Sequence, residues 1–140
     1  TGIFTEKYPL GRSCPLHISA AGKAILAHLP ADRREAVLYE SDLEQVTERT
    51  ITDPEELATE LETIRETGVA FSSEEAARGM RGVAAPVLDT DETVLGSINV
   101  AGPVSRIAGD RFREDLAQRV IEASNVIEIT ITNEREYRNR

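Results

Sequence analysis

Apolar residues recur every three or four positions in several parts of the chain, which is the pattern of amphipathic helices. These stretches predict four helices, over residues 19–29, 32–39, 53–67 and 110 to about 132. Residues at the boundaries support the first and third of them. Ser19 and Asp53 are expected to cap the N-termini, and Gly68 is expected to end the third helix.

Shorter apolar runs between the last two helices predict β-strands. Strands are expected over residues 69–73, 82–88 and 93–101, the last two joined as a hairpin. Residues 3–5 suggest the end of a further strand. Segment 127–132 alternates apolar and polar residues, so the sequence leaves the end of the last helix ambiguous. Helices and antiparallel strands together predict an α+β fold with helices packed on a sheet.

Acidic residues are concentrated in one part of the chain. The 140 residues carry 25 acids and 16 bases, a net charge of −9. Residues 31–66 hold twelve acids against four arginines, which accounts for −8 of that total. Such a balance argues that these residues do not themselves bind the phosphate backbone of a nucleic acid.

Lysine is scarce, since only Lys7 and Lys23 occur among the sixteen bases. An acid-rich, lysine-poor surface suits solubility in concentrated salt, where charge repulsion is screened within ~3 Å at 1 M. The alternative explanation is a genome that favours arginine codons, combined with an ordinary acidic surface. The sequence leaves both readings open.

Several functional classes are excluded or made improbable by simple counts. The single cysteine, Cys14, rules out an internal disulfide framework. No apolar run approaches the ~20 residues of a membrane helix. The chain starts at Thr1, without Met, and is expected to be a fragment. Lys23 follows Gly22, but His17 and Ala24 stand where a phosphate loop needs Gly and Ser or Thr.

Two segments offer candidate binding chemistry. The helix predicted from residue 19 opens with Ala20, Ala21 and Gly22, whose small side chains leave backbone N–H groups accessible to an anion. Close packing against a sheet explains the same residues equally well. The loop 74–82 mixes acids with arginines, and is either the rim of a pocket or a solvated, salt-bridged turn.

Four motifs in order resemble the IclR family of transcriptional regulators. Residues 15–27 (PLHISAAGKAILA) are similar to a signature of that family, and TIT at 50–52 precedes the helix that ends at Gly68. SSEE at 72–75 leads to GMRGVAAPV at 79–87, and NVAGPVSR at 99–106 matches a Gly-Pro-x-Ser-Arg turn. The resemblance covers nearly the whole chain.

This resemblance implies a domain and its partners. Family proteins join a winged helix-turn-helix to a C-terminal effector domain of GAF-like α+β fold, with a long C-terminal helix. Residues 1–140 match the effector domain only and are expected to lack its first strands. The implied partners are a small organic-acid effector, further copies in a homodimer or tetramer, and DNA only through the absent domain. A cytoplasmic, non-enzymatic protein without cofactor, metal or membrane contact is expected.

The resemblance also implies the effector-binding positions. The N–H groups of Ala20 and Ala21 would hold a carboxylate, and the other pocket positions are Ser72, Gly82, Asn99 and Ala101. The best-known family pattern has Asp, Cys, Ser and Ser at those last four positions. The replacements imply a roomier and partly less polar pocket, with an added amide at Asn99. A larger or aromatic acid is therefore expected rather than a small keto acid.

Arg81 and Arg106 are further candidates to bind the carboxylate of an acid, although a turn-fixing role is favoured for Arg106. Two other functions are compatible with the sequence. One alternative function is an enzyme on a GAF-like fold that uses Cys14 or His17. The other is an oligomerisation module with a vestigial pocket, in which the C-terminal helix takes part.

Overall fold

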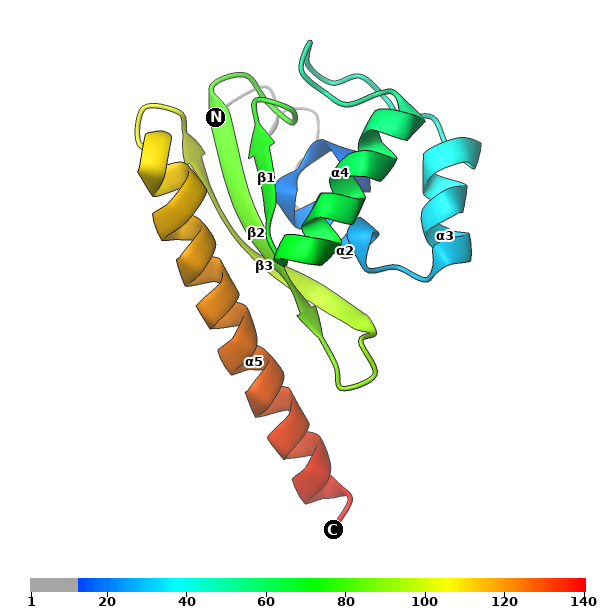
Figure 1. Ribbon diagram of the computed structural model, residues 1–140, viewed down its shortest axis with the longest axis vertical. Helices are drawn as coiled ribbons and strands as arrows, with labels where there is room; N and C mark the ends of the chain where they lie inside the picture. The colour runs from blue at the N-terminus through cyan, green and yellow to red at the C-terminus, as the bar shows by residue number, and fades with distance from the viewer. Residues whose placement is uncertain (1–12) are drawn as a thin grey trace.

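A three-stranded antiparallel sheet separates two layers of helices (Figure 1). The structure, a computed structural model, describes residues 13–140. The strands lie in the order β1 (Ala70–Ser73), β2 (Met80–Leu88) and β3 (Val94–Pro103). The expected α+β fold is confirmed, including the hairpin of β2 and β3. The strand suggested for residues 3–5 lies outside the described residues.

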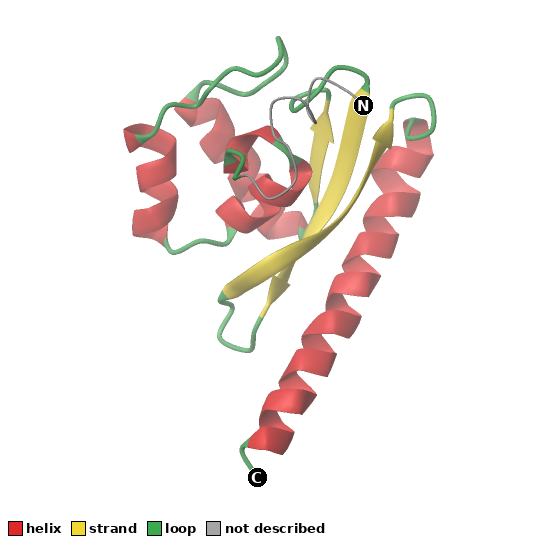
Figure 2. Cartoon of the chain, turned by 180° about the vertical axis from the view of Figure 1, so that it is seen from behind, coloured by secondary structure: helices red, strands yellow, loops and turns green. Residues whose placement is uncertain are grey.

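Helices cover both faces of this sheet (Figures 1 and 2). A 3-10 turn, η1 (Leu16–Ile18), leads into α2 (Ala20–Ala27), which packs on the sheet with α4 (Pro54–Thr67) over it. The outer helix α3 (Ala31–Glu35) continues as the π-turn η2 (Ala36–Glu40). The opposite face is covered by the π-turn η3 (Arg111–Asp115) and the long α5 (Leu116–Arg138).

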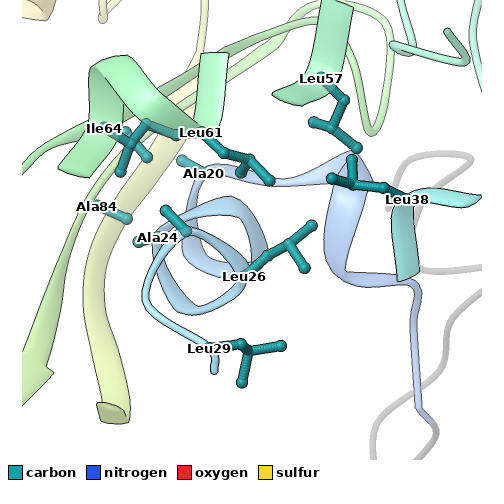
Figure 3. Packing of buried hydrophobic residues seen from close by; sticks show 11 residues of the cluster. Ala20, Ala24, Leu26, Leu29, Leu38, Leu57, Leu61, Ile64 and Ala84 are labelled. Carbon is teal, nitrogen blue, oxygen red and sulfur yellow. The ribbon is translucent and has the colours of Figure 1, made fainter. Parts of the chain in front are cut away.

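Each face of the sheet has its own hydrophobic core. On one face, Leu57, Leu61 and Ile64 of α4 meet α2, whose alanines let the helix approach Ala84 of β2 (Figure 3). On the other face, Val83 packs with a cluster that α5 and the preceding turn complete. Residues 83–87 of β2 are buried without interruption because this central strand is covered on both sides.

Local signals correctly placed the starts of α2 and α4 and the end of α4, whereas α2 ends at Ala27, two residues before the predicted Leu29. The Ser19 hydroxyl accepts the Gly22 N–H at 3.0 Å, and Asp53 Oδ1 accepts the Glu55 N–H at 3.3 Å. Gly68 ends α4 with φ of 78°, a left-handed conformation that suits glycine. These contacts confirm both predicted N-caps and the predicted helix stop.

The end of the chain, which the sequence left ambiguous, is helical. α5 continues through segment 127–132 to Arg138. Glu128 on this segment accepts the Leu88 N–H at 2.7 Å, and the Thr130 hydroxyl bonds the Val126 carbonyl one turn back at 2.8 Å. These contacts favour the helix over the strand that the alternating pattern also allowed. In the described part of the chain, no helix has the apolar length needed to cross a membrane.

We expect Gly22→Ala to destabilise the fold severely. A Cβ at this position would lie 2.2 Å from the Leu16 carbonyl oxygen, so η1 and α2 would have to move apart. A loss of about 3 kcal/mol in the free energy of unfolding is expected, from urea denaturation. Gly96→Ala is the matched control, because nothing lies within 4 Å of its Cβ. Equal stability of the two variants would contradict the packing described for α2.

Candidate functional site

The start of α2 presents backbone donors toward one face of the sheet. Ser19 takes the Gly22 N–H, and the Ser19 carbonyl takes the Lys23 N–H at 2.9 Å. Within residues 13–140, the N–H groups of Ala20 and Ala21 have no acceptor. Two donors at the positive end of a helix dipole are therefore available to an anion.

Strand register brings three of the predicted positions into one row. Ser72 pairs with Gly82, and Gly82 pairs with Ala101, across β1, β2 and β3. Asn99 lies two residues from Ala101 and therefore on the same face of β3. A Cβ on Gly82 would lie 3.5 Å from the Ala20 Cβ and 3.9 Å from the Ala101 Cβ, so the row faces the start of α2.

The predicted positions differ in their exposure. Ser72 and Gly82 are buried, whereas Asn99 and Ala101 are exposed on β3. The Ser72 hydroxyl has no hydrogen-bond partner among the residues described. On the same face, the Ser97 hydroxyl donates to the Ala21 carbonyl at 3.1 Å and fixes the start of α2 against β3. No pattern in the sequence indicates this contact.

Arg81 lies on the opposite face of the sheet from this row. It alternates with Gly82, donates to the Ile107 carbonyl at 2.9 Å and to the Ser73 hydroxyl at 3.0 Å, and stacks on Phe112. Its role is to fix the segment after β3, so it does not face the predicted effector positions. Arg106 is exposed in the turn after β3.

A buried ammonium group lies next to these positions and was missed by the sequence analysis. Lys23 of α2 is fully buried. Its Nζ contacts Glu75 Oε1 at 2.7 Å, the Phe71 carbonyl at 2.7 Å and Glu60 Oε1 at 3.2 Å. Three donors thus meet three acceptors, which satisfies the ammonium group in the interior. The available signal was a lysine among the apolar residues of a predicted core helix, in a chain with only two lysines.

The two carboxylates around Lys23 are not equivalent. Glu75 Oε2 accepts the Ser73 N–H at 2.9 Å, so both Glu75 oxygens are bonded. Glu60 Oε2 is covered and has no hydrogen-bond partner in the described part of the chain. Burial raises the pKa of Glu60 above its ordinary value of 4.5, although the Lys23 charge acts in the opposite direction.

The Cys14 and His17 pair offers no catalytic geometry in the described structure. His17 is buried, with Nε2 2.8 Å from the Glu44 carbonyl oxygen, whereas Cys14 is exposed. No hydrogen bond joins the two side chains. Among the described residues, no group of histidine, cysteine and carboxylate side chains is arranged to hold a metal ion.

The described residues form a GAF-like α+β domain in which the start of α2 lies beside a row of small and polar residues on the sheet. The chain matches the family described as bacterial transcriptional regulator IclR C-terminal over residues 4–129. It therefore belongs to the IclR family and corresponds to the C-terminal domain of these regulators.

Individual relatives agree with this assignment. The chain is 36% identical over 131 residues to a probable HTH-type transcriptional regulator ArcR from Halobacterium salinarum, covering 92% of this chain and 50% of that protein. It is also 36% identical to the transcriptional repressor IclR of Escherichia coli, covering 81% of this chain and 42% of the repressor. The chain thus spans about half the length of the curated relatives that it matches.

A solved structure shows the same fold. The C-terminal domain of the transcriptional regulator KdgR from E. coli superposes with a TM-score of 0.76 at 31% identity. The match covers 85% of this chain and 72% of that domain. The relatives and this structure are transcriptional regulators, which agrees with a non-enzymatic protein.

Removing the buried ammonium group should destabilise the domain. We expect Lys23→Met to lower the free energy of unfolding by about 3 kcal/mol, because Glu60 and Glu75 would be left without their cation. Arg49→Met is the control, since Arg49 pairs with Glu74 at 3.1 Å while 58% exposed and should cost less than about 1 kcal/mol. A similar cost for both variants in urea denaturation would contradict the role assigned to Lys23.

The orphaned oxygen of Glu60 predicts a pH dependence of stability. A raised pKa means that the folded chain keeps the Glu60 proton to higher pH than the unfolded chain. This contribution to stability is present below pH 4.5 and is lost as pH rises through the folded-state pKa. Glu60→Gln should therefore gain stability relative to the parent chain over that range, measured by urea denaturation in steps of pH. Glu62→Gln, on an exposed neighbour in α4, controls for loss of one charge, and an equal gain there would contradict the assignment.

Proposed function

We propose that this chain senses a small organic acid for a DNA-binding regulator, and that the acid binds between the start of α2 and the sheet. One observation carries the proposal. Among residues 13–140 the N–H groups of Ala20 and Ala21 have no acceptor, and the Ala20 side chain lies beside the row of Ser72, Gly82 and Ala101, which comes from three strands. An anion at this place would meet helix donors at its carboxylate and small side chains around its body.

The side chains favour a ligand with some bulk. Gly82 and Ala101 place little or no side chain beside Ala20, so a ligand lying over this row would meet no bulky group there. Ser72 and Asn99 add an unpartnered hydroxyl and an exposed amide on the same face. The proposed ligand is therefore a larger or aromatic acid with at least one further polar group.

For the whole protein, we propose that residues 1–140 form the effector-binding part of a longer cytoplasmic regulator. A winged helix outside this chain would contact DNA, which agrees with the net charge of −9 here. Effector binding would shift the population between arrangements of subunits or domains, and so change DNA affinity. Assembly as a homodimer or tetramer belongs to the same proposal.

The two alternative functions have less support. An enzyme using Cys14 or His17 would need a nucleophile and base in reach of one another, and the His17 ring is already bonded to a backbone carbonyl. An oligomerisation module with a vestigial pocket would not need free donors at Ala20 and Ala21.

A thermal-shift screen of organic acids, phenols and sugar acids tests the proposed site. A binding acid should raise the melting temperature by linkage, in low salt and in concentrated salt. Gly82→Leu should abolish the shift by filling the space beside Ala20, and Asn99→Leu should weaken it about tenfold in affinity. Gln118→Leu, on the exposed side of α5, is the control and should bind as the parent chain does.

Two results would count against the proposal. Unchanged binding in both site variants would place the ligand elsewhere, and chemical turnover of a bound acid would favour the enzyme. Variants that bind nothing must first be shown to retain the parent melting temperature within a few degrees.

A further inference from the structure

A hollow lies at the other end of α2 from the predicted effector positions. It has a volume of about 760 Å³ and is lined by the segment after α2, by α3, by the end of α4, by the β2–β3 turn and by α5. None of the six predicted positions lines it. Its volume falls within the range of small-molecule sites, roughly 300–1,000 Å³.

One wall of this hollow is basic. Arg33 and Arg34 of α3 line it together with Arg65 of α4. They are three of the four arginines in the strongly acidic stretch 31–66. Within residues 13–140, none of the three forms an ion pair with a carboxylate. Three unpaired guanidinium groups around one hollow in a chain of net charge −9 call for a physical explanation.

Part of the explanation is structural. Arg65 Nη1 donates to the Ala27 carbonyl at 2.9 Å, and Arg34 Nη1 donates to the Leu29 carbonyl at 3.0 Å. Arg65 thereby caps the last carbonyl of α2, where cations are favoured, and Arg34 binds a carbonyl two residues beyond the helix. Each bond uses one guanidinium nitrogen, however, and holds the rest of the group beside the hollow. No such bond of the Arg33 side chain is seen among the described residues.

The remaining walls are acidic and apolar. Asp91 and Glu92 of the β2–β3 turn line the hollow, as does Glu128 of α5. Glu66 stands beside Arg65 on α4 and also lines it. Apolar residues also line the hollow, among them Leu29, Pro86, Val94 and Ile121. Arginines and carboxylates thus line one hollow, and none of these arginines is paired with one of these carboxylates in the described structure.

We propose that this hollow is a second ligand site, which takes a small dipolar molecule with an apolar body, of the class of apolar amino acids. Its carboxylate would meet Arg33, Arg34 and Arg65, whose planar donors suit carboxylates. Its ammonium group would meet the carboxylates of Asp91 and Glu128. A purely anionic ligand fits less well, because the carboxylates lining the hollow would repel it.

The proposal is independent of the effector site. None of the six predicted effector positions lines the hollow, so a ligand here would not contact the proposed effector site. Failure of the dipolar-ligand proposal would therefore leave the proposed effector function untouched.

Backbone NMR of the whole chain tests this second site. L-leucine and L-phenylalanine are titrated at low salt, and 3-phenylpropanoate and 2-phenylethylamine serve as matched probes with one charge each. We expect saturable shifts of the Arg65, Gly68 and Thr93 amides with the amino acids. Each single-charge probe should bind about tenfold more weakly, because one set of charge-assisted hydrogen bonds is missing.

Two exposed side chains offer clean variants. Arg33→Gln and Asp91→Asn each remove one charge from opposite walls and should weaken amino-acid binding about tenfold. Arg119→Gln, on α5 outside the hollow, should leave it unchanged. Absence of saturable binding by both amino acids would overturn the proposal and leave Arg34 and Arg65 with their carbonyl contacts only. Equal binding of 3-phenylpropanoate would also overturn it, in favour of a simple anion site.

Discussion

The buried ammonium group of Lys23 is the contact on which the positions of α2, α4 and β1 depend. It joins three segments that are far apart in sequence, through Glu60, Phe71 and Glu75. Glu75 extends the connection, because its backbone carbonyl accepts the buried Thr50 hydroxyl at 2.7 Å. The loop before α4 and the loop after β1 are thereby held together. An exposed pair such as Arg78 with Glu48 adds little by comparison, since solvent screens it.

Close packing places α2 as firmly as charge does. Gly22 lets η1 approach the helix to a distance that no side chain would allow, and Ala20 and Ala24 bring α2 down onto the sheet (Figure 3). The small residues at the start of α2 suit either an anion site or close packing. The structure shows that they pack, while the first two N–H groups have no acceptor among residues 13–140. The two readings are compatible because packing uses side chains and anion binding uses the backbone.

Features with a local cause could be predicted from the sequence, and features with a distant cause could not. Ser19, Asp53 and Gly68 act within a few residues of themselves, so their patterns sufficed. The partners of Lys23 lie 37 to 52 residues away, and nothing in the sequence around Lys23 indicates them. The end of α5 was ambiguous for the same reason, because Glu128 contacts Leu88 forty residues earlier. To predict that the effector positions lie together, the pairing register of the strands must be known. The family resemblance implied that register, whereas the periodicity of apolar residues alone did not.

The scarcity of lysine and the excess of acidic residues have separate causes. The only lysine in the described structure is buried, so the surface cations there are all arginines. Lys23 has a geometric reason to be retained, because three ammonium donors match three acceptors and a planar guanidinium group would not. Codon preference for arginine would replace lysine without changing net charge, so the excess of acids needs a separate cause. That excess repels an approaching organic anion at low salt, whereas at 1 M salt the repulsion is screened within ~3 Å. An anion site built from backbone N–H groups acts at hydrogen-bond distance, and its contacts therefore persist where long-range attraction would be lost.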